Sequence, residues 1–296
     1  MSRVALARLA AWCVVLASLI AHPLAQAVER VAYVTVVDSA TERPVTDVTA
    51  GQIIIREDGN RREVLSVSPA TSDMTVAVII DNSQAASPTI TDLRKALATF
   101  LDTIQGLGPV GLFSVADRPT ILREYTTSQK ELQDAAGRVF HVPSSGATLL
   151  DTIADVAKGI GRRTSDRAAI VVVTGENTDF STLQYRDVLE TLRDSGAMLY
   201  VTVLVNPNGS MSTDEARNRA TVLDRGPRES GGTRTDVLTS MSFEARLKAL
   251  GQMLTSQYRV TYAQPQSLIP PEKFEALSAK PGLEVRGAPA RGQGKK

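Results

Sequence analysis

The sequence predicts an α/β fold: a doubly wound, mostly parallel sheet of the Rossmann-like sandwich type, with a small N-terminal β module. Three apolar runs carry this prediction, at 74–81, 168–174 and 197–205. They lack polar alternation, which is typical of strands buried on both faces of a parallel sheet. Segments with apolar residues at helical spacing alternate with these runs, as in a chain that crosses from one parallel strand to the next.

Residues 1–27 have the three parts of a secretory signal peptide and are set aside from the fold. Arg3 and Arg8 supply positive charge, residues 9–21 are apolar, and a small-x-small pattern ends at Ala27. The apolar stretch is short for a bilayer span, which needs about 20 residues. An uncleaved membrane anchor is the alternative. We expect cleavage after Ala27 and an exported product, periplasmic or extracellular, without a membrane span.

Cleavage after Ala27 would change the composition. The single Cys and the single Trp would leave, and with two arginines lost the basic residues would fall from 33 to 31 against 32 acidic residues. A chain without cysteine is neither a disulfide scaffold nor a thiol enzyme. Its near-neutral charge gives no electrostatic reason to expect nucleic acid as a partner. His141 would be the one histidine left, which excludes a zinc site built from several histidines.

Residues 28–70 predict the small β module. The run at 30–38 is rich in β-branched residues, and Asp58-Gly59-Asn60 lies between two strand-like arms, which is a strong hairpin signal. Three short strands in about forty residues are too few for an independent core. We therefore expect the module to dock on the domain that follows.

Residues 71–264 are predicted to form the α/β domain. After its first strand, Leu93, Leu97 and Phe100 recur at helical spacing within 89–104. The other predicted elements follow in chain order: an antiparallel pair of strands at 110–116 and 120–125, helices at 128–139 and 149–160, the strand at 168–174, a helix at 183–194, the strand at 197–205, helices at 212–224 and 242–255, and a strand at 257–263. This alternation is that of a doubly wound sheet.

The C-terminal residues differ in composition from the domain before them. Residues 265–287 are predicted to be an accessory segment, rich in proline at first, with one strand at 283–286. Residues 288–296 are Gly-rich and basic, which predicts a disordered tail. The chain shows no internal repeat.

Three loops of the predicted domain carry acidic or hydroxyl side chains next to strand or helix ends. Asp81 and Ser83 follow the first strand, Thr148 comes directly before a helix, and residues 175–179 follow the next strand. Ligands bind at the carboxyl ends of the strands in an open α/β sheet, so these loops could meet at one edge. A purely structural interpretation is also open: Asp81 would accept backbone N–H bonds at the turn, and Thr148 would cap the following helix.

Taken together, these loops resemble the von Willebrand factor A domain. The matching pattern is strand-Asp81-x-Ser83, then Gly146-Ala147-Thr148-x-Leu150, then the strand VVVTGEN. It is similar above all to secreted bacterial proteins in which the domain follows a small β module. The flanking segments EDGNRREVLSV, GPVGLFSVAD, SGGTRTDV and SQYRVTYA fit the same family, so the resemblance covers roughly residues 30–287.

The resemblance implies a metal-ion-dependent adhesion site that holds a divalent cation, usually Mg²⁺, with Asp81, Ser83 and Thr148 as ligands. Ala85 stands where the family has a second serine and Gly175 where it has an aspartate, so two ligands are missing. Magnesium gives up water reluctantly and needs well-placed oxygen ligands. We therefore expect no bound metal, or weak Mg²⁺ binding only.

Further residues belong to the predicted site. The side chains that could substitute for the missing ligands are those of Ser87, Glu176 and Asp179. The predicted binding edge also includes the loop residues Asn82, Gln84, Ala85, Gly146, Gly175 and Asn177. In the family, an acidic side chain of a partner protein often fills the last position around the metal.

The sequence and the resemblance together predict an exported, non-enzymatic binding or adhesion module for another protein or a surface polymer, with an acidic side chain of the partner as one route of recognition. A structural role in the cell envelope is one alternative. A hydrolase on a similar scaffold is another, but the chain lacks a G-x-S-x-G nucleophile elbow and a histidine cluster. The G-x-G-x-x-G match at 106–111 follows a predicted helix and precedes a strand, which is the reverse of a dinucleotide site.

Overall fold

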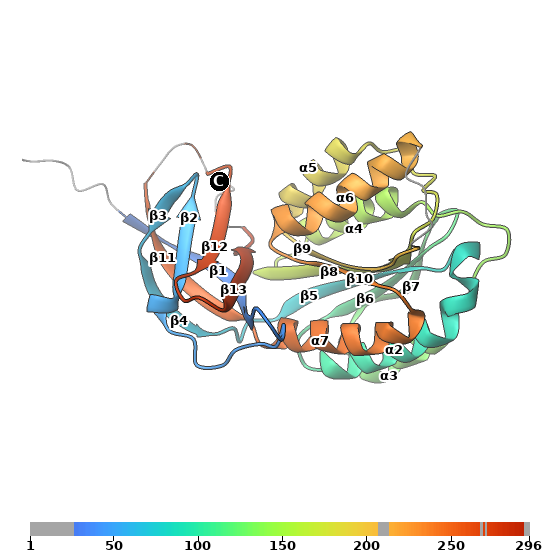
Figure 1. Cartoon of the computed structure of the whole chain (residues 1–296), viewed down its shortest axis with the longest axis horizontal. Helices are drawn as coiled ribbons and strands as arrows, with labels where there is room; N and C mark the ends of the chain where they lie inside the picture. Colours follow the sequence, from blue (N-terminus) through green and yellow to red (C-terminus); the bar gives the residue numbers. More distant parts are fainter. Residues whose placement is uncertain (1–26, 207–212, 267–268, 270, 293–296) are drawn as a thin grey trace, which may run out of the picture.

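The computed structural model describes residues 27–206, 213–266, 269 and 271–292, which form two lobes (Figure 1). An α/β lobe holds a six-stranded sheet, and a β lobe holds one sheet of four strands and one of three. The predicted fold class, α/β with a mostly parallel sheet and a small β module, is confirmed. The predicted signal peptide lies outside the described residues, apart from Ala27, the first residue of strand β1 (Ala27–Asp38).

Six strands form the sheet of the α/β lobe. They are β5 (Met74–Asp81), β6 (Val110–Val115), β7 (Pro119–Thr126), β8 (Arg167–Gly175), β9 (Met198–Leu204) and β10 (Arg234–Val237). Their order is β10-β9-β8-β5-β6-β7, and every pair is parallel except β6 with β7. All residues of β5 are buried, as its continuous apolar run predicts.

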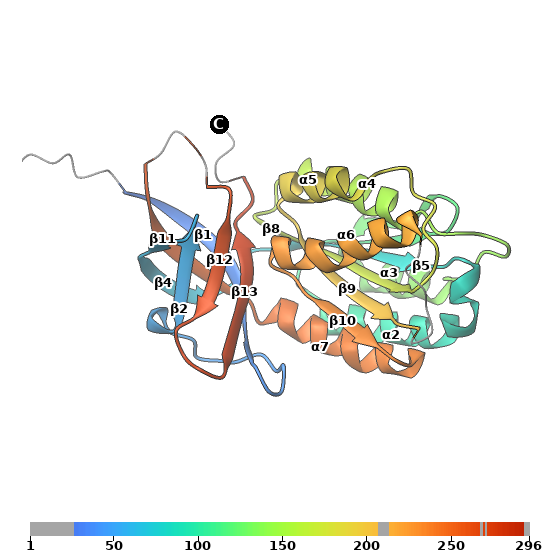
Figure 2. The same cartoon turned by 45° about the horizontal axis from the view of Figure 1, so that its top comes forward.

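Helices cover both faces of this sheet (Figures 1 and 2). On one face lie α2 (Ile90–Thr103), α3 (Gln129–Gly137) and α7 (Phe243–Thr255), and on the other lie α4 (Leu149–Gly161), α5 (Tyr185–Ser195) and α6 (Asp214–Ser230). Short 3-10 helices are η1 (Ala50–Gln52), η2 (Gln84–Thr89) and η3 (Ser240–Ser242). The predicted stripe of α2, with Leu93, Leu97 and Phe100, is fully buried against the sheet. No helix within the described ranges combines the length and apolar character that crossing a membrane requires.

The sequence did not predict β10 or the full length of α6. β10 has four residues at the edge of the sheet, and Arg234 and Asp236 interrupt any apolar run. α6 continues to Ser230, past the predicted end at 224, although Pro227 lies inside it. Pro227 removes one intrahelical hydrogen bond, and the helix ends soon after it, at Gly231, in a left-handed conformation with φ of 80°.

The β lobe combines strands from both ends of the chain. Besides β1, its strands are β2 (Ile53–Glu57), β3 (Asn60–Arg62), β4 (Val64–Pro69), β11 (Tyr258–Pro265), β12 (Phe274–Ser278) and β13 (Leu283–Pro289). One sheet has the order β13-β1-β11-β4, and the other has the order β12-β2-β3. The hairpin predicted around Asp58-Gly59-Asn60 is confirmed by the antiparallel pairing of β2 with β3.

This arrangement corrects the predicted role of the C-terminal strands. The strand predicted at 257–263, which we assigned to the α/β domain, is β11 and pairs with β1 and β4. Residues 265–287 hold β12 and part of β13, where the sequence predicted one strand. The physical reason is that residues 28–70 cannot bury their own apolar faces. Tyr262 and Val285 from the C-terminal strands complete the core of this lobe.

A buried carboxylate joins the two sheets of the β lobe. Glu57 on β2 is 1% exposed, and it accepts hydrogen bonds from the Tyr262 hydroxyl (2.8 Å) and the Gln264 amide (3.1 Å) of β11. Its other partner is Arg62, at 2.9 Å. Burial, together with the hydrogen bond to Glu57, raises the pKa of Tyr262, so this hydroxyl stays a donor. These satisfied polar contacts fix how the two sheets lie on each other.

Arg291 fastens the end of the β lobe to the α/β lobe. Its Nε donates to the carbonyl of Ser195 (2.8 Å), one Nη to that of Ser165 (2.9 Å) and the other to that of Ile160 (2.6 Å). Ile160 and Ser195 lie in the last turns of α4 and α5, where carbonyls lack intrahelical partners and favour a positive charge. The disorder predicted for 288–296 is therefore wrong for the part that the structure describes.

We expect Arg291→Ala to lower the free energy of unfolding by about 2 kcal/mol or more, because the helix ends lose several charge-assisted hydrogen bonds. Urea unfolding followed by circular dichroism measures the change. Arg228→Ala is the matched control, since Arg228 is exposed and pairs with Asp224 on the same helix. Such a surface pair contributes about 0–1 kcal/mol. Equal losses in the two variants would contradict the fastening role of Arg291.

Candidate functional site

The loops at the carboxyl ends of the central strands meet at the end of the α/β lobe that points away from the β lobe (Figure 1). The N–H of Val142 donates to the carbonyl of Asn82 (2.8 Å), and the N–H of Gln84 donates to the carbonyl of Ser145 (3.3 Å). The loop at 140–148 therefore lies against the loop that follows β5. The structure brings together the loops that the sequence predicted to meet.

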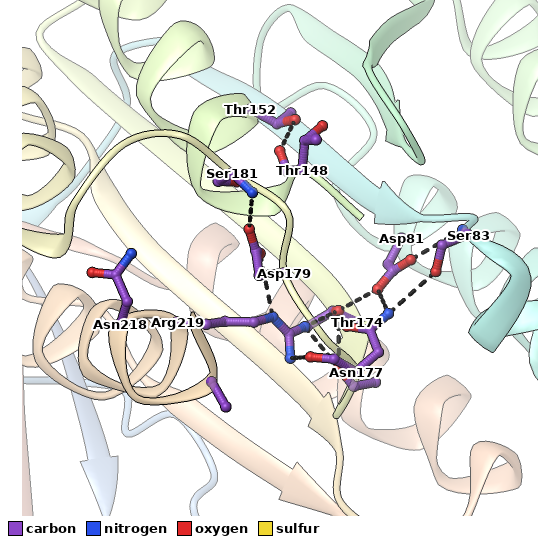
Figure 3. A network of polar contacts seen from close by, with 12 residues as sticks. Asp81, Ser83, Thr148, Thr152, Thr174, Asn177, Asp179, Ser181, Asn218 and Arg219 are labelled. Carbon is purple, nitrogen blue, oxygen red and sulfur yellow. Dashed lines mark hydrogen bonds and ion pairs between the residues drawn. The ribbon is translucent and has the colours of Figure 1, made fainter. Parts of the chain in front are cut away.

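Asp81 is the centre of a buried polar network at this edge (Figure 3). It ends β5 and is 2% exposed. Its Oδ1 accepts the N–H of Ser83 (3.1 Å), and its Oδ2 accepts the Thr174 hydroxyl (2.7 Å) and the Asn177 amide (2.9 Å). The Asn177 amide also donates to the Ser83 hydroxyl (3.2 Å). The structural interpretation of Asp81, as an acceptor of backbone N–H bonds at the turn, is confirmed.

Arg219 of α6 places a guanidinium in the same network. One Nη donates to the Thr174 hydroxyl (2.6 Å) and to the carbonyl of Gly175 (2.7 Å), and the other donates to the carbonyl of Asn177 (3.3 Å). Its Nε lies 3.5 Å from Oδ2 of Asp179, and both side chains are almost inaccessible to water. The guanidinium thereby joins α6 to the end of β8 and to the loop that follows it.

Burial acts on the pKa of both members of this ion pair. It raises the pKa of Asp179, while the hydrogen bonds from Ser181 and the charge of Arg219 act in the opposite direction. It lowers the pKa of Arg219, and the carboxylates of Asp81 and Asp179 oppose that shift. A guanidinium stays protonated in proteins. The attraction between the opposite charges therefore favours the ionised forms of Asp179 and Arg219 at this buried site.

Thr148, the third predicted ligand, lies apart from Asp81 and Ser83 (Figure 3). It is the N-cap residue of α4, but its side chain makes no capping hydrogen bond. Its hydroxyl instead donates to the carbonyl of Ala116, at 3.2 Å. The predicted cap by the Thr148 side chain is therefore wrong, because the carbonyl at the end of β6 takes the hydroxyl.

The three side chains that could substitute for missing ligands lie elsewhere. The Glu176 carboxylate accepts the N–H of Asn206 at 2.7 Å. Asp179 faces Arg219, and Ser87 is half-buried within η2. The structure therefore does not gather these oxygens around Asp81.

Two edge residues hold the 140–148 loop in place. The Asn82 amide donates to the carbonyl of Phe140 (2.9 Å), and Oε1 of Gln84 accepts the N–H of Ser144 (3.0 Å). Both contacts run from the loop after β5 to the loop before α4. Asn82 and Gln84 thus help to position the edge.

Some polar atoms of this site lack a hydrogen-bond partner in the protein. Within the described residues, four buried side-chain atoms have no hydrogen-bond partner, and all lie here: Asn82 Oδ1, Asn177 Oδ1, Asp179 Oδ2 and Arg219 Nε. A cavity of about 30 Å³ beside Asp81, with Ala85 and Gly175 in its wall, has room for a water molecule. We therefore expect ordered water in this network.

These residues do not fit a divalent cation. Both oxygens of Asp81 already accept hydrogen bonds from protein donors, Ala85 offers no oxygen, and the Thr148 hydroxyl is bonded to a backbone carbonyl. The buried guanidinium of Arg219 would also repel a cation placed next to Asp81.

The sequence did not reveal Arg219 or Thr174. Thr174 ends an apolar run and looks like the last residue of a strand. Arg219 did carry a signal, because it shares the buried face of α6 with Val222 and Leu223 at helical spacing. A charge on a buried stripe indicates a buried partner of opposite charge.

Comparisons with known proteins concern the fold. No family model matches the chain, and no curated protein matches it. A von Willebrand factor type A structure from Catenulispora acidiphila is 10% identical, covering 91% of this chain and 73% of that chain, with a TM-score of 0.50. Human Sec24c, a COPII-coat protein, is 9% identical with a TM-score of 0.49 over 74% of this chain, which spans 43% of that structure. BatB from Bacteroides thetaiotaomicron is 13% identical with a TM-score of 0.48, covering 62% of this chain and all (100%) of that chain. The likeness to the Catenulispora acidiphila structure indicates a shared fold and nothing further. The likenesses to Sec24c and BatB, with TM-scores below 0.5, support no inference about this chain.

We expect Thr174→Val to lower the free energy of unfolding by about 2–4 kcal/mol, because the change keeps the shape but removes one buried hydrogen-bond partner from Asp81 and one from Arg219. Denaturant unfolding measures the loss. Thr191→Val is the control, since the Thr191 hydroxyl donates to a carbonyl of its own helix, α5. A loss at Thr174 no greater than that at Thr191 would show that the hydroxyl does not join the two charges.

Proposed function

We propose that the chain, which has the fold of a von Willebrand factor A domain, is a non-enzymatic module that binds another protein or a surface polymer through the carboxyl edge of its central sheet. One observation carries the proposal: large apolar side chains are exposed on the loops at that edge. They are Phe140, Val142, Phe180, Leu238 and Met241, which are 61%, 38%, 63%, 73% and 80% exposed. Several such groups at one edge are typical of an interaction surface.

The loops that carry these side chains are held in place by the rest of the edge. The N–H of Val142 donates to the carbonyl of Asn82 (2.8 Å), and the N–H of Phe180 donates to that of Ala147 (2.7 Å). The Phe180 ring lies directly over Gly146, where an added Cβ would stand 2.3 Å from the ring. A surface that is already ordered loses less entropy on binding.

Phe140 is the second ring of this surface. The guanidinium of Arg94 lies 4.2 Å from the centre of the Phe140 ring, within the range of a cation–π contact. Arg94 is in turn fixed by a hydrogen bond from its Nε to the carbonyl of Val139, at 2.5 Å. The ring is thus oriented although most of it is open to solvent.

We favour apolar contact over an acidic side chain as the mode of recognition. The charges of the Asp81 network are buried, and Arg219 is 4% exposed, so a partner's carboxylate would find no accessible cation there. Large aromatic side chains can supply most of the binding energy of such a surface. The N-terminal sequence supports placing this activity outside the cytoplasm, in the periplasm or beyond the cell.

Photo-crosslinking at Phe180 tests the proposal. A photoreactive phenylalanine at position 180 should give a defined cross-linked product in the protein's native compartment, whereas the same group at Leu277 should not. Leu277 is 38% exposed and lies on β12, in the other lobe. With the cross-linked partner purified, Phe180→Ser should weaken binding by about tenfold or more, and Leu277→Ser should not.

Two results would count against the edge as the binding surface. One is cross-linking at position 277 with none at 180. The other is equal affinity of the purified partner for Phe180→Ser and for the unchanged protein. A defined cross-linked product at neither position would favour the structural role instead.

A further inference from the structure

Two carboxylates and one guanidinium are buried together at the carboxyl edge of the sheet. Asp81 and Asp179 are each 2% exposed, and Arg219 is 4% exposed. An ionised carboxylate without a partner of opposite charge is strongly destabilising in such a place. The edge therefore requires a cation, and the chain supplies one from α6.

We propose that Arg219 is a built-in cation that takes the place of the divalent ion implied at this edge by the resemblance to the von Willebrand factor A domain. The inference does not depend on the proposed binding function. Its strongest support is positional: one Nη of Arg219 donates to the carbonyl of Gly175 (2.7 Å), the residue that stands where the metal-binding aspartate is missing. The guanidinium therefore contacts the residue at which the implied ligand is absent.

The guanidinium also performs the joining role of a metal ion. It contacts the Thr174 hydroxyl (2.6 Å), the carbonyl of Asn177 (3.3 Å) and the carboxylate of Asp179 (3.5 Å). The Thr174 hydroxyl passes the interaction on to Asp81, at 2.7 Å. One side chain of α6 therefore holds the end of β8, the loop after it and, through a single hydroxyl, the end of β5 (Figure 3).

Arginine suits this place better than lysine would. Its planar fork has five donors, which can satisfy several acceptors at once, and it keeps its charge at every physiological pH. Arg219 lies on the buried stripe of α6 beside Val222 and Leu223, which are 0% and 2% exposed, so its aliphatic stem is buried with apolar neighbours.

A covalently attached cation differs from a bound ion in one respect that can be measured. A bound divalent ion dissociates, so a metal-dependent edge responds to chelators and to ion concentration. Arg219 cannot dissociate. The stability of this protein should therefore be the same with a chelator and with millimolar Mn²⁺.

The test is a charge-rescue experiment by urea unfolding. Arg219→Met keeps an aliphatic stem and removes the charge, and we expect it to lower the unfolding midpoint far more than Arg225→Met. Arg225 is the matched control, because it is exposed on the same helix and pairs with Glu229 there. Adding Asp179→Asn to Arg219→Met should recover a large part of the loss, because it removes a carboxylate that has lost its partner. A role in packing alone would give no such recovery.

Mn²⁺ is the probe for the second part of the test. We expect neither Mn²⁺ nor a chelator to move the midpoint of the unchanged protein. The proposal is overturned by a saturable Mn²⁺ shift that disappears in Asp81→Asn, or by a failure of Asp179→Asn to relieve Arg219→Met. If Arg219→Met alone does not fold, the double variant decides: folded protein supports the proposal, and unfolded protein contradicts it.

Discussion

The Thr174 hydroxyl stands between a buried guanidinium and a buried carboxylate, and the arrangement of the edge depends on this bridge. It accepts from Arg219 at 2.6 Å and donates to Asp81 at 2.7 Å. The loops after β5 and β8, together with α6, exclude water from this edge, where Asp81 is 2% and Arg219 4% exposed. Charges left there must be paired within the protein. Arg219 supplies the positive charge, to Asp179 directly and to Asp81 through the Thr174 hydroxyl.

Two other arginines join elements at the opposite end of the α/β lobe, through hydrogen bonds to carbonyls and to a glutamine side chain. Arg291 joins the end of the β lobe to the last turns of α4 and α5. Arg167, 4% exposed at the start of β8, donates to the carbonyl of Ser72 (2.8 Å) and to the Gln257 side chain (3.2 Å), which lie on the two connections into the β lobe. The β lobe and the candidate binding edge are thus fixed at opposite ends of one rigid sheet.

The sequence predicts some parts of the fold and of the site better than others. A feature that leaves a local pattern in the sequence can be predicted, whereas a contact between residues far apart in the chain leaves none. β5, β8 and β9 are buried on both faces, so each one shows as a local apolar run. The pairing of β1 with β11 joins residues more than two hundred positions apart (Val31 and Thr261, for example) and leaves no local pattern. Asp81 and Ser83 lie in a short motif and were identified. Arg219 was not, because its partners are distant in sequence and its one local sign is a charge on an apolar stripe.

The most direct test of a built-in cation is an anomalous difference map from crystals of this protein grown with Mn²⁺. We predict no manganese peak beside Asp81 and Ser83, and clear density for the Arg219 guanidinium within hydrogen-bonding distance of the Thr174 hydroxyl. A manganese ion coordinated by Asp81, with Arg219 turned away, would contradict the central claim.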